Sequence, residues 1–396
     1  EFRRVLFRSH THCFSLIKRR WGKGVYRLFP DKHHQDWTRT MQPSVPTHLP
    51  AGSPLTADRV GWVDYAKGMC ILLVVLFHTV NHYEEAVGAT GWMRWIVEFS
   101  KPFRMPDFFL ISGLFLPRTI NANLTTYIDK KVVHFAYFYL LWLALTLLLT
   151  DNDVLRADPI QFAKLYLWNI VQPTGVLWFV HMLAVFYVVT RLVSRLPKWV
   201  VFVAAAALQV AHQALWIDTP SFIANRFMDY YVFFFLGYAA ADTVFAVADR
   251  AKARRWVTIG VIAGWALANE WLTRQGLHHL PGYGVMMGLA GALAIVEIAA
   301  LLSMTKSARF LRYCGQNSIV IYLTFFFPMT ILERLLASNN AIPDVGWACF
   351  AILVISAVLP LLFHLAIKRT PLIALYVRPK LFRIGNKPAP LASATA

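Results

Sequence analysis

Charged side chains are scarce in this chain: they make up 15% of its 396 residues, whereas 57% of the residues are hydrophobic. A soluble globular chain typically has about 25% charged and about 45–50% apolar residues. The shortage of charge excludes an ordinary soluble domain, and the repeated long apolar runs indicate helices that cross a membrane. The sequence therefore predicts an all-α polytopic membrane protein in contact with a lipid bilayer.

Cysteine is also rare. The four cysteines are Cys13, Cys70, Cys314 and Cys349, and their positions do not have the spacing of a metal site. Three of them lie in or beside apolar runs. We therefore expect neither a disulfide framework nor a bound metal.

Acidic residues are few, since 21 Asp and Glu stand against 39 Lys and Arg, for a net charge of +18. Such an excess can indicate binding to nucleic acid, but ten of the Lys and Arg fall in the first 40 residues and most of the others flank apolar runs. Basic residues in that arrangement report membrane topology. No nucleic-acid partner is expected.

We expect ten membrane-spanning helices, at about residues 65–83, 103–117, 133–150, 174–190, 199–216, 229–248, 256–273, 282–303, 317–332 and 347–367. Segments 91–101 and 160–171 are typical of helices that lie in the membrane interface. The even-numbered loops between the spans carry 13 Lys and Arg, and the odd-numbered loops carry 7. Because the more basic loops are cytoplasmic, both termini are expected in the cytoplasm.

The chain divides into four parts. Residues 1–40 are interpreted as an artefact or non-native extension, because EFRRVLFRS (1–9) reads like a translated sequencing adapter, and Met41 is a plausible start. Residues 41–58 are expected to form a flexible tail, 59–368 the transmembrane domain, and 369–396 a basic cytoplasmic tail.

The first span carries two ionisable side chains, Lys67 and His78. Eleven residues make almost three helical turns, so the two side chains share a face, about 16 Å apart along the axis. A neutral imidazole in this position can accept a proton from an attacking hydroxyl or take up an acyl group. Lys67 can meet an anionic cofactor at the cytoplasmic mouth, and Asp64, three residues earlier, can pair with it or orient it. The alternative is that Lys67 anchors the helix at the membrane surface and His78 is a structural hydrogen-bond donor.

The second span begins with two prolines, Pro102 and Pro106, which interrupt the start of the helix. Arg104 and Asp107 are three residues apart and therefore face the same way. Arg104 can hold an acyl oxyanion or an acidic acceptor. The alternative is a simple Arg104–Asp107 ion pair. Gly113 is expected to permit a close approach of another helix.

Other polar groups fall within or beside the remaining spans; they are His181, His212, Asp229, Asp242, Glu270 and Glu297. Ionisable residues inside a membrane are expensive and often functional. Of these residues, Glu270 is predicted to lie near the outer face and to line a groove for the acceptor substrate.

Five segments resemble those of one known family. They are DYAKGMCILLVVLFH (64–78), PFRMPDFFLISGLF (102–115), LWFVHMLAVFY (177–187), FFFLGY (233–238) and GQNSIVIYL (315–323). In this order they resemble the membrane acyltransferase-3 superfamily, particularly its ten-helix bacterial inner-membrane branch. The likeness runs over about residues 59–368.

The resemblance implies an O-acyltransferase of the bacterial inner membrane. Such an enzyme moves an acyl group, most often acetyl, from cytoplasmic acyl-coenzyme A (acetyl-CoA) to a hydroxyl of an extracytoplasmic envelope glycan. The resemblance implies that His78 is the catalytic residue and that Lys67 takes the place of the basic residue in the coenzyme A site. Apart from the resemblance, we predict Arg104 and Asp107 as further catalytic residues and Asp64 as a second residue of the coenzyme A site. Trp178 and Glu270 are predicted to bind the acceptor substrate.

The chain also departs from the family pattern. Many members have a histidine shortly after the Asn-Ser-x-x-x-Tyr segment, where this chain has Phe325. Two other hypotheses stay open. One is a proton-coupled transporter or flippase, because intramembrane Asp and Glu suit proton coupling and Gly/Pro interruptions suit broken helices, although no internal repeat is visible. The other is a structural or sensory membrane protein that keeps the fold without the catalysis.

Overall fold

The computed structural model describes residues 60–173, 175–277, 280–305, 308–339 and 341–384. The predicted extension at 1–40 and tail at 41–58 lie outside the described residues. Every regular element in the described residues is helical, which confirms the predicted all-α class.

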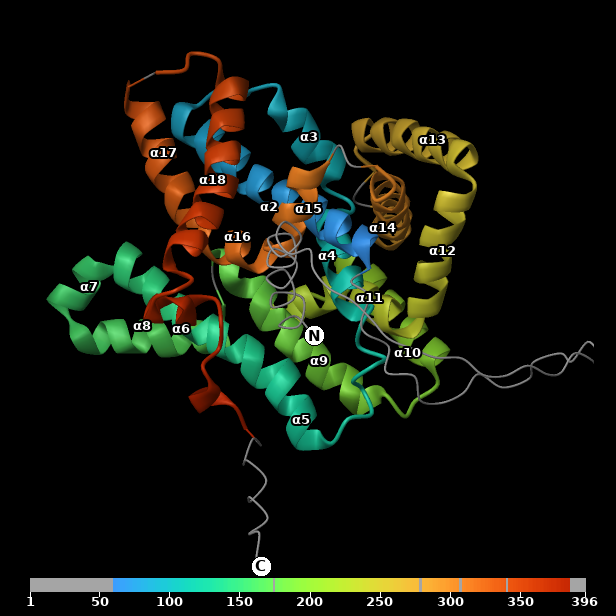
Figure 1. Cartoon of the computed structure of the whole chain (residues 1–396), viewed down its shortest axis with the longest axis horizontal. Coiled ribbons are helices and arrows are strands. Elements are labelled where there is room, and N and C mark those ends of the chain that lie inside the picture. Colours follow the sequence, from blue (N-terminus) through green and yellow to red (C-terminus); the bar gives the residue numbers. More distant parts are fainter. Residues whose placement is uncertain (1–59, 174, 278–279, 306–307, 340, 385–396) are drawn as a thin grey trace, which may run out of the picture. The chain divides into compact units, whose positions relative to one another are not determined.

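Helix α2 (Gly61–Val87) is the helix around which several others pack. Its 27 residues span about 40 Å, enough to cross a hydrocarbon core of about 30 Å. It contacts α4 (Arg104–Gly113), α14 (Tyr283–Leu302), α15 (Arg309–Gln316) and α18 (Val345–Ile367), as Figure 1 shows. The contact with α15 is close, since a Cβ on Gly68 or on Gly315 would clash with the backbone of the facing helix.

Helices α4 and α11 (Phe222–Ala239) also pack backbone to backbone. A Cβ on Gly113 would clash with the carbonyl oxygen of Phe234, and one on Gly237 would clash with that of Leu110. The structure thus confirms the expectation that Gly113 permits a close helix approach. This contact joins the last turns of α4 and α11, and the first turns of the same two helices line the candidate site.

Replacing Gly113 by alanine should therefore destabilise the protein, by the roughly 1–3 kcal/mol typical of overpacking, because the obstacle is a backbone atom. The measurement is the thermal unfolding midpoint of the detergent-purified protein. Gly260→Ala is the matched control, because this helical glycine has nothing within 4 Å of an added Cβ. Equal midpoints for the two variants would show that the α4–α11 contact is not tight.

Two of the predicted spans are bent, which corrects their description as single helices. Segment 229–248 contains the end of α11 and the start of α12 (Ala241–Ala253), which meet at 76°. Ala240 leaves the helical conformation (φ −116°, ψ 26°), because α11 packs on α4 and α10 (Lys198–Gln213) whereas α12 packs on α14.

Segment 317–332 divides into α16 (Ser318–Thr324) and α17 (Phe326–Asn339), which meet at 50°. Here the cause is visible in the sequence. Pro328 has no N–H to donate to the carbonyl group of Thr324, four residues earlier, and its ring crowds that carbonyl. The helix therefore bends between these residues.

By length and composition, five helical segments among the described residues can cross a membrane, or seven if each bent pair counts as one span. The five segments are 61–87, 124–150, 159–193, 283–302 and 345–367, of which 159–193 includes the undescribed residue 174. Span 103–117 was predicted too long, because α4 has ten residues and covers only about 15 Å. Helices α10 and α13 (Arg255–Arg274) match predicted spans 199–216 and 256–273 in position, but they are not among the helices that are long and apolar enough to cross a membrane.

The remaining elements are α3 (Met93–Ser100), α5 (Leu124–Ile128), the π-helical turn η2 (Asp129–Val133), α6 (His134–Thr150), α7 (Asn152–Ala157), α8 (Pro159–Val171), η3 (Gly175–Leu177), α9 (Trp178–Val193), η5 (Pro371–Leu375) and η6 (Lys380–Phe382). In Figure 1, α12 to α14 lie on one side of α2, and α6 to α9 lie on the other.

Part of the predicted C-terminal tail is folded onto the helices. Arg378 donates to the carboxylate of Asp129 at 2.7 Å, and the Trp142 indole donates to the carbonyl oxygen of Leu375 at 2.9 Å. These contacts connect residues 371–384 to η2 and α6.

Candidate functional site

A cavity of about 270 Å³ lies where the second half of α2 meets the first turns of α4, α9 and α11. The described residues that line it are Val74, Phe77, His78, Arg104, Met105, Phe108, Gly175, Val176, Trp178, Phe179, Phe222, Arg226, Tyr230 and Tyr322. Three of the predicted site residues, His78, Arg104 and Trp178, come together here from separate parts of the chain. The cavity is slightly smaller than the range of about 300–1,000 Å³ common for small-molecule sites.

Aromatic rings surround His78. The centroid of its imidazole lies 5.1 Å from that of Phe77 and 5.6 Å from that of Phe325. Phe325 is fully buried, and it is the residue at which the chain departs from the expected histidine. The phenylalanine that replaces the expected histidine therefore packs against the candidate catalytic imidazole and gives it an apolar neighbour.

Arg104 is buried beside His78, with 7% of its surface exposed. Its guanidinium carbon lies 3.9 Å from the centroid of the Phe77 ring, a cation–π contact. Among the described residues, its Nη1 atom has no hydrogen-bond partner. A buried cation with an unsatisfied donor costs free energy, so the arrangement favours a ligand that brings an oxygen to this nitrogen.

Asp107 lies one turn further along α4 and is 1% exposed. Within the described ranges, neither of its carboxyl oxygens has a hydrogen-bond partner, and the structure contains no ion pair between Asp107 and Arg104. The alternative interpretation of these residues as a simple ion pair is therefore wrong. Asp107 is not among the described residues that line the cavity.

Lys67 and Asp64 lie toward the other end of α2. The Lys67 Nζ atom is 5.9 Å from the centroid of the Phe115 ring, and the Arg118 guanidinium carbon is 5.4 Å from the same centroid. Asp64 is buried and accepts a hydrogen bond from Gln316 at 3.2 Å. This end of α2 thus has two cations on one aromatic ring and a carboxylate bound to α15.

Glu270 lies apart from these residues. On α13, its Oε1 atom accepts hydrogen bonds from the Trp95 indole at 2.9 Å and from Arg274 at 2.5 Å. It is not one of the described residues that line the cavity.

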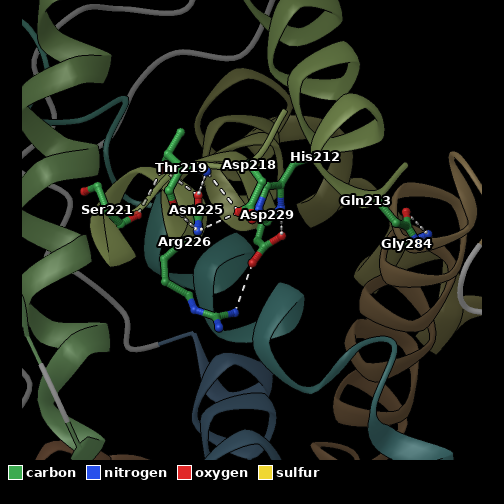
Figure 2. Close-up of polar contacts among 9 residues, drawn as sticks. All are labelled: His212, Gln213, Asp218, Thr219, Ser221, Asn225, Arg226, Asp229 and Gly284. Atoms are coloured by element: carbon green, nitrogen blue, oxygen red, sulfur yellow. Dashed lines mark hydrogen bonds and ion pairs between the residues drawn. The ribbon is translucent and has the colours of Figure 1, made fainter. Parts of the chain in front are cut away.

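Arg226 also lines the cavity; it lies between the predicted spans 199–216 and 229–248 and was not among the predicted site residues. It is in the second turn of α11, where its Nη1 donates to Asp229 Oδ2 at 3.0 Å. The other oxygen of Asp229 is 2.8 Å from His212 Nδ1, so Arg226 and His212 contact the same carboxylate (Figure 2). The signals available in the sequence were the polar residues His212 and Asp229, which lie within the predicted spans 199–216 and 229–248.

His82 was also not identified, although it follows His78 by four residues on the same helix. The two imidazole centroids are 6.2 Å apart, and His82 Nδ1 is 4.0 Å from Glu333 Oε2 on α17. A row of polar groups therefore leads from His78 toward α17.

No group of three or more His, Cys, Asp or Glu is placed to hold a metal ion in the part of the chain that the structure describes. The cavity lining offers one imidazole and two guanidinium groups. His78 can transfer a proton and Arg104 can stabilise a developing negative charge, while Arg226 adds a second cation to the lining.

The fold and the site thus define an all-α membrane protein with a small, mostly apolar cavity whose lining includes a histidine and two arginines. The chain belongs to the acyltransferase-3 family, because the family model described as an acyltransferase domain matches residues 60–365. It is similar to Inner membrane protein YcfT of Escherichia coli (strain K12), with 25% identity over 309 residues, covering 71% of this chain and 83% of the relative. No solved structure matches it significantly. Family membership makes the chain a membrane acyltransferase and implies an acyl donor.

Proposed function

We propose that this protein transfers an acyl group, in the simplest case acetyl, from acyl-coenzyme A in the cytoplasm to a hydroxyl of an envelope glycan across the bacterial inner membrane. The observation that supports this most directly is the position of His78 on the cavity wall beside Arg104. A proton acceptor next to a cation is the pair of groups that acyl transfer to a hydroxyl requires.

In the proposed reaction, the His78 imidazole removes the proton from the acceptor hydroxyl as its oxygen attacks the thioester carbonyl carbon. Arg104 stabilises the negative charge that develops on the carbonyl oxygen. The carbon–sulfur bond then breaks, and the leaving coenzyme A thiolate takes the proton that His78 removed, which returns the imidazole to its neutral form. The product is an ester on the glycan.

We propose that the donor approaches from the other end of α2, where Lys67 and Arg118 flank Phe115. Coenzyme A carries phosphate groups, which favour a site with several cations. Asp64, held by α15, would position this part of α2. Lys67 and His78 are about 16 Å apart along the helix axis, so an extended acyl-carrying arm would have to connect the two ends.

The proposed orientation puts Lys67 on the cytoplasmic side and the His78 cavity toward the outer side, with both termini in the cytoplasm. It is supported by the greater number of Lys and Arg in the even-numbered loops. The relative named as an inner membrane protein supports the same location. Ten spans are part of this proposal, with α4, α10 and α13 crossing as short or less apolar helices inside the bundle.

The test uses radiolabelled acetyl-coenzyme A. The detergent-purified protein should bind it and hydrolyse its thioester slowly, because water can replace the missing acceptor. In membrane vesicles, hydrolysis should require the cytoplasmic face to be outward, so inverted vesicles should be active and right-side-out vesicles inactive. Absence of both binding and hydrolysis, with correctly folded protein, would contradict the proposed donor.

A proton-coupled transporter or flippase is the second candidate. The specific observation in its favour is the pair of bent helices, since interrupted helices are common in transporters. The same experiment separates the two, because a transporter has no need to cleave a thioester.

A further inference from the structure

The cavity beside His78 has a positive balance of charge. Of the fourteen described residues that line it, two are arginines and none is acidic. The proposed reaction needs one cation, Arg104, for a transient oxyanion. Arg226 is left without a role in that reaction.

The N-termini of three helices add to the positive electrostatic potential of the cavity. The first residues of α4, α9 and α11 (Arg104, Trp178 and Phe222) all line the cavity. The N-cap residues of α4 and α9, Phe103 and Leu177, make no side-chain hydrogen bond to their helices. Each helix N-terminus carries about half a positive charge, so an anion in the cavity is favoured from several sides.

Arg226 is held in a defined position. Its bond to Asp229 uses one of the five N–H donors that a guanidinium carries, and His212 fixes Asp229 from the other side (Figure 2). The Ser221 hydroxyl accepts from the backbone N–H of Ala224 and caps α11. The side chain is therefore presented to the cavity from an anchored helical turn.

Aromatic rings surround the same guanidinium. Its carbon lies 5.1 Å from the centroid of Phe222 and 5.7 Å from that of Trp178. Trp178 is stacked on Tyr230, with their centroids 5.6 Å apart. An arginine among aromatic faces suits a small ligand with one anionic group and one less polar face.

We propose that the acceptor is an acidic sugar, such as a uronic acid, and that its carboxylate binds Arg226 while its ring packs on Trp178 and its reactive hydroxyl faces His78. This assignment rests on the proposed function. The cavity volume of about 270 Å³ suits one sugar residue. A planar guanidinium binds a carboxylate through two parallel hydrogen bonds, which would fix the orientation of the sugar.

A carboxylate can reach Arg226 from a second source, the acyl chain of a dicarboxylic donor such as succinyl-coenzyme A. The experiment therefore crosses two donors with two acceptor types. Acetyl- and succinyl-coenzyme A are each combined with methyl glucuronide and methyl galacturonide, and with the neutral methyl glucoside and galactoside. Initial transfer rates are measured for the natural chain, Arg226→Gln and Arg226→Lys.

With acetyl-coenzyme A, the natural chain should use at least one uronide about 10- to 100-fold better than its neutral counterpart, the range expected for one charged hydrogen-bonded contact. Arg226→Gln should lose this preference through KM while keeping thioester hydrolysis, and Arg226→Lys should keep part of it. Arg274→Gln is the matched control, because Arg274 also pairs with a carboxylate on its own helix but is absent from the cavity lining.

No uronide preference in the natural chain would overturn the proposal. So would an Arg226→Gln variant that changes the ratio of succinyl to acetyl transfer and leaves the uronide preference intact. If the natural chain hydrolysed the thioester but transferred the acyl group to none of the sugars, the sugar assignment alone would be contradicted. If the natural chain did not hydrolyse the thioester at all, the proposed function itself would be contradicted.

Discussion

Replacing His78 by glutamine is expected to lower the acyl-transfer rate by about 10²- to 10⁴-fold, the contribution usual for a general base. Glutamine has a similar size and keeps polar atoms beside Phe77 and Phe325, but it cannot take up the proton of an attacking hydroxyl. The loss should appear in kcat, because the cavity wall is otherwise unchanged. The measurement is initial transfer with labelled acetyl-coenzyme A and saturating acceptor.

The matched control is His364→Gln. His364 is also in a long apolar helix, α18, but it contacts Tyr376 with the ring centroids 5.3 Å apart and is not among the described residues of the cavity. This variant should keep most of the activity. If the folded His78→Gln protein transferred acyl groups at the natural rate, the proposed catalytic role of His78 would be wrong.

Replacing Arg104 by methionine should have opposite effects on activity and stability. Transfer should fall by about 10²- to 10³-fold, the typical loss when one group that stabilises an oxyanion is removed. The thermal unfolding midpoint should stay the same or rise, because an apolar side chain of similar volume replaces a buried cation whose Nη1 has no partner among the described residues.

Arg94→Met is the control for this prediction. Arg94 binds the buried carboxylate of Glu84 at 2.5 Å and Asn81 at 2.7 Å, and it does not line the cavity. Its replacement leaves Glu84 buried with fewer partners, so stability should fall while the chemistry at His78 is retained in the folded fraction. A strong loss of stability in Arg104→Met with intact transfer would show that Arg104 is a structural residue.

The candidate catalytic side chains were predictable because each lies in an apolar stretch. His78 and Arg104 are conspicuous there, since polar groups in a membrane are expensive and rarely remain without a role. Their neighbourhood was not predictable in the same way. The contact of Phe325 with His78 joins residues 247 positions apart in the chain, and no local pattern reports such a distance.

Arg226 illustrates the opposite case. In the sequence it precedes an apolar run by a few residues and resembles an ordinary loop cation. In the structure α11 begins at Phe222, earlier than predicted, and its second turn brings Arg226 to the cavity. The start of α11 depends on the Ser221 cap and on a hydrogen bond from the Phe222 backbone N–H to Gln172, a residue 50 positions away.

The sequence by itself determined that the protein is helical and membrane-bound, because a bilayer leaves apolar helices as the simplest way to satisfy the backbone. It also indicated the family, and it singled out His78 and Arg104 as candidate site residues because they are ionisable side chains in apolar stretches. Only the tertiary structure decided that α4 is short, that the chain bends at Ala240, and that Arg226 joins the cavity. These features depend on packing between distant helices, at glycine contacts such as Gly113 with α11, and packing has no local signature in the chain.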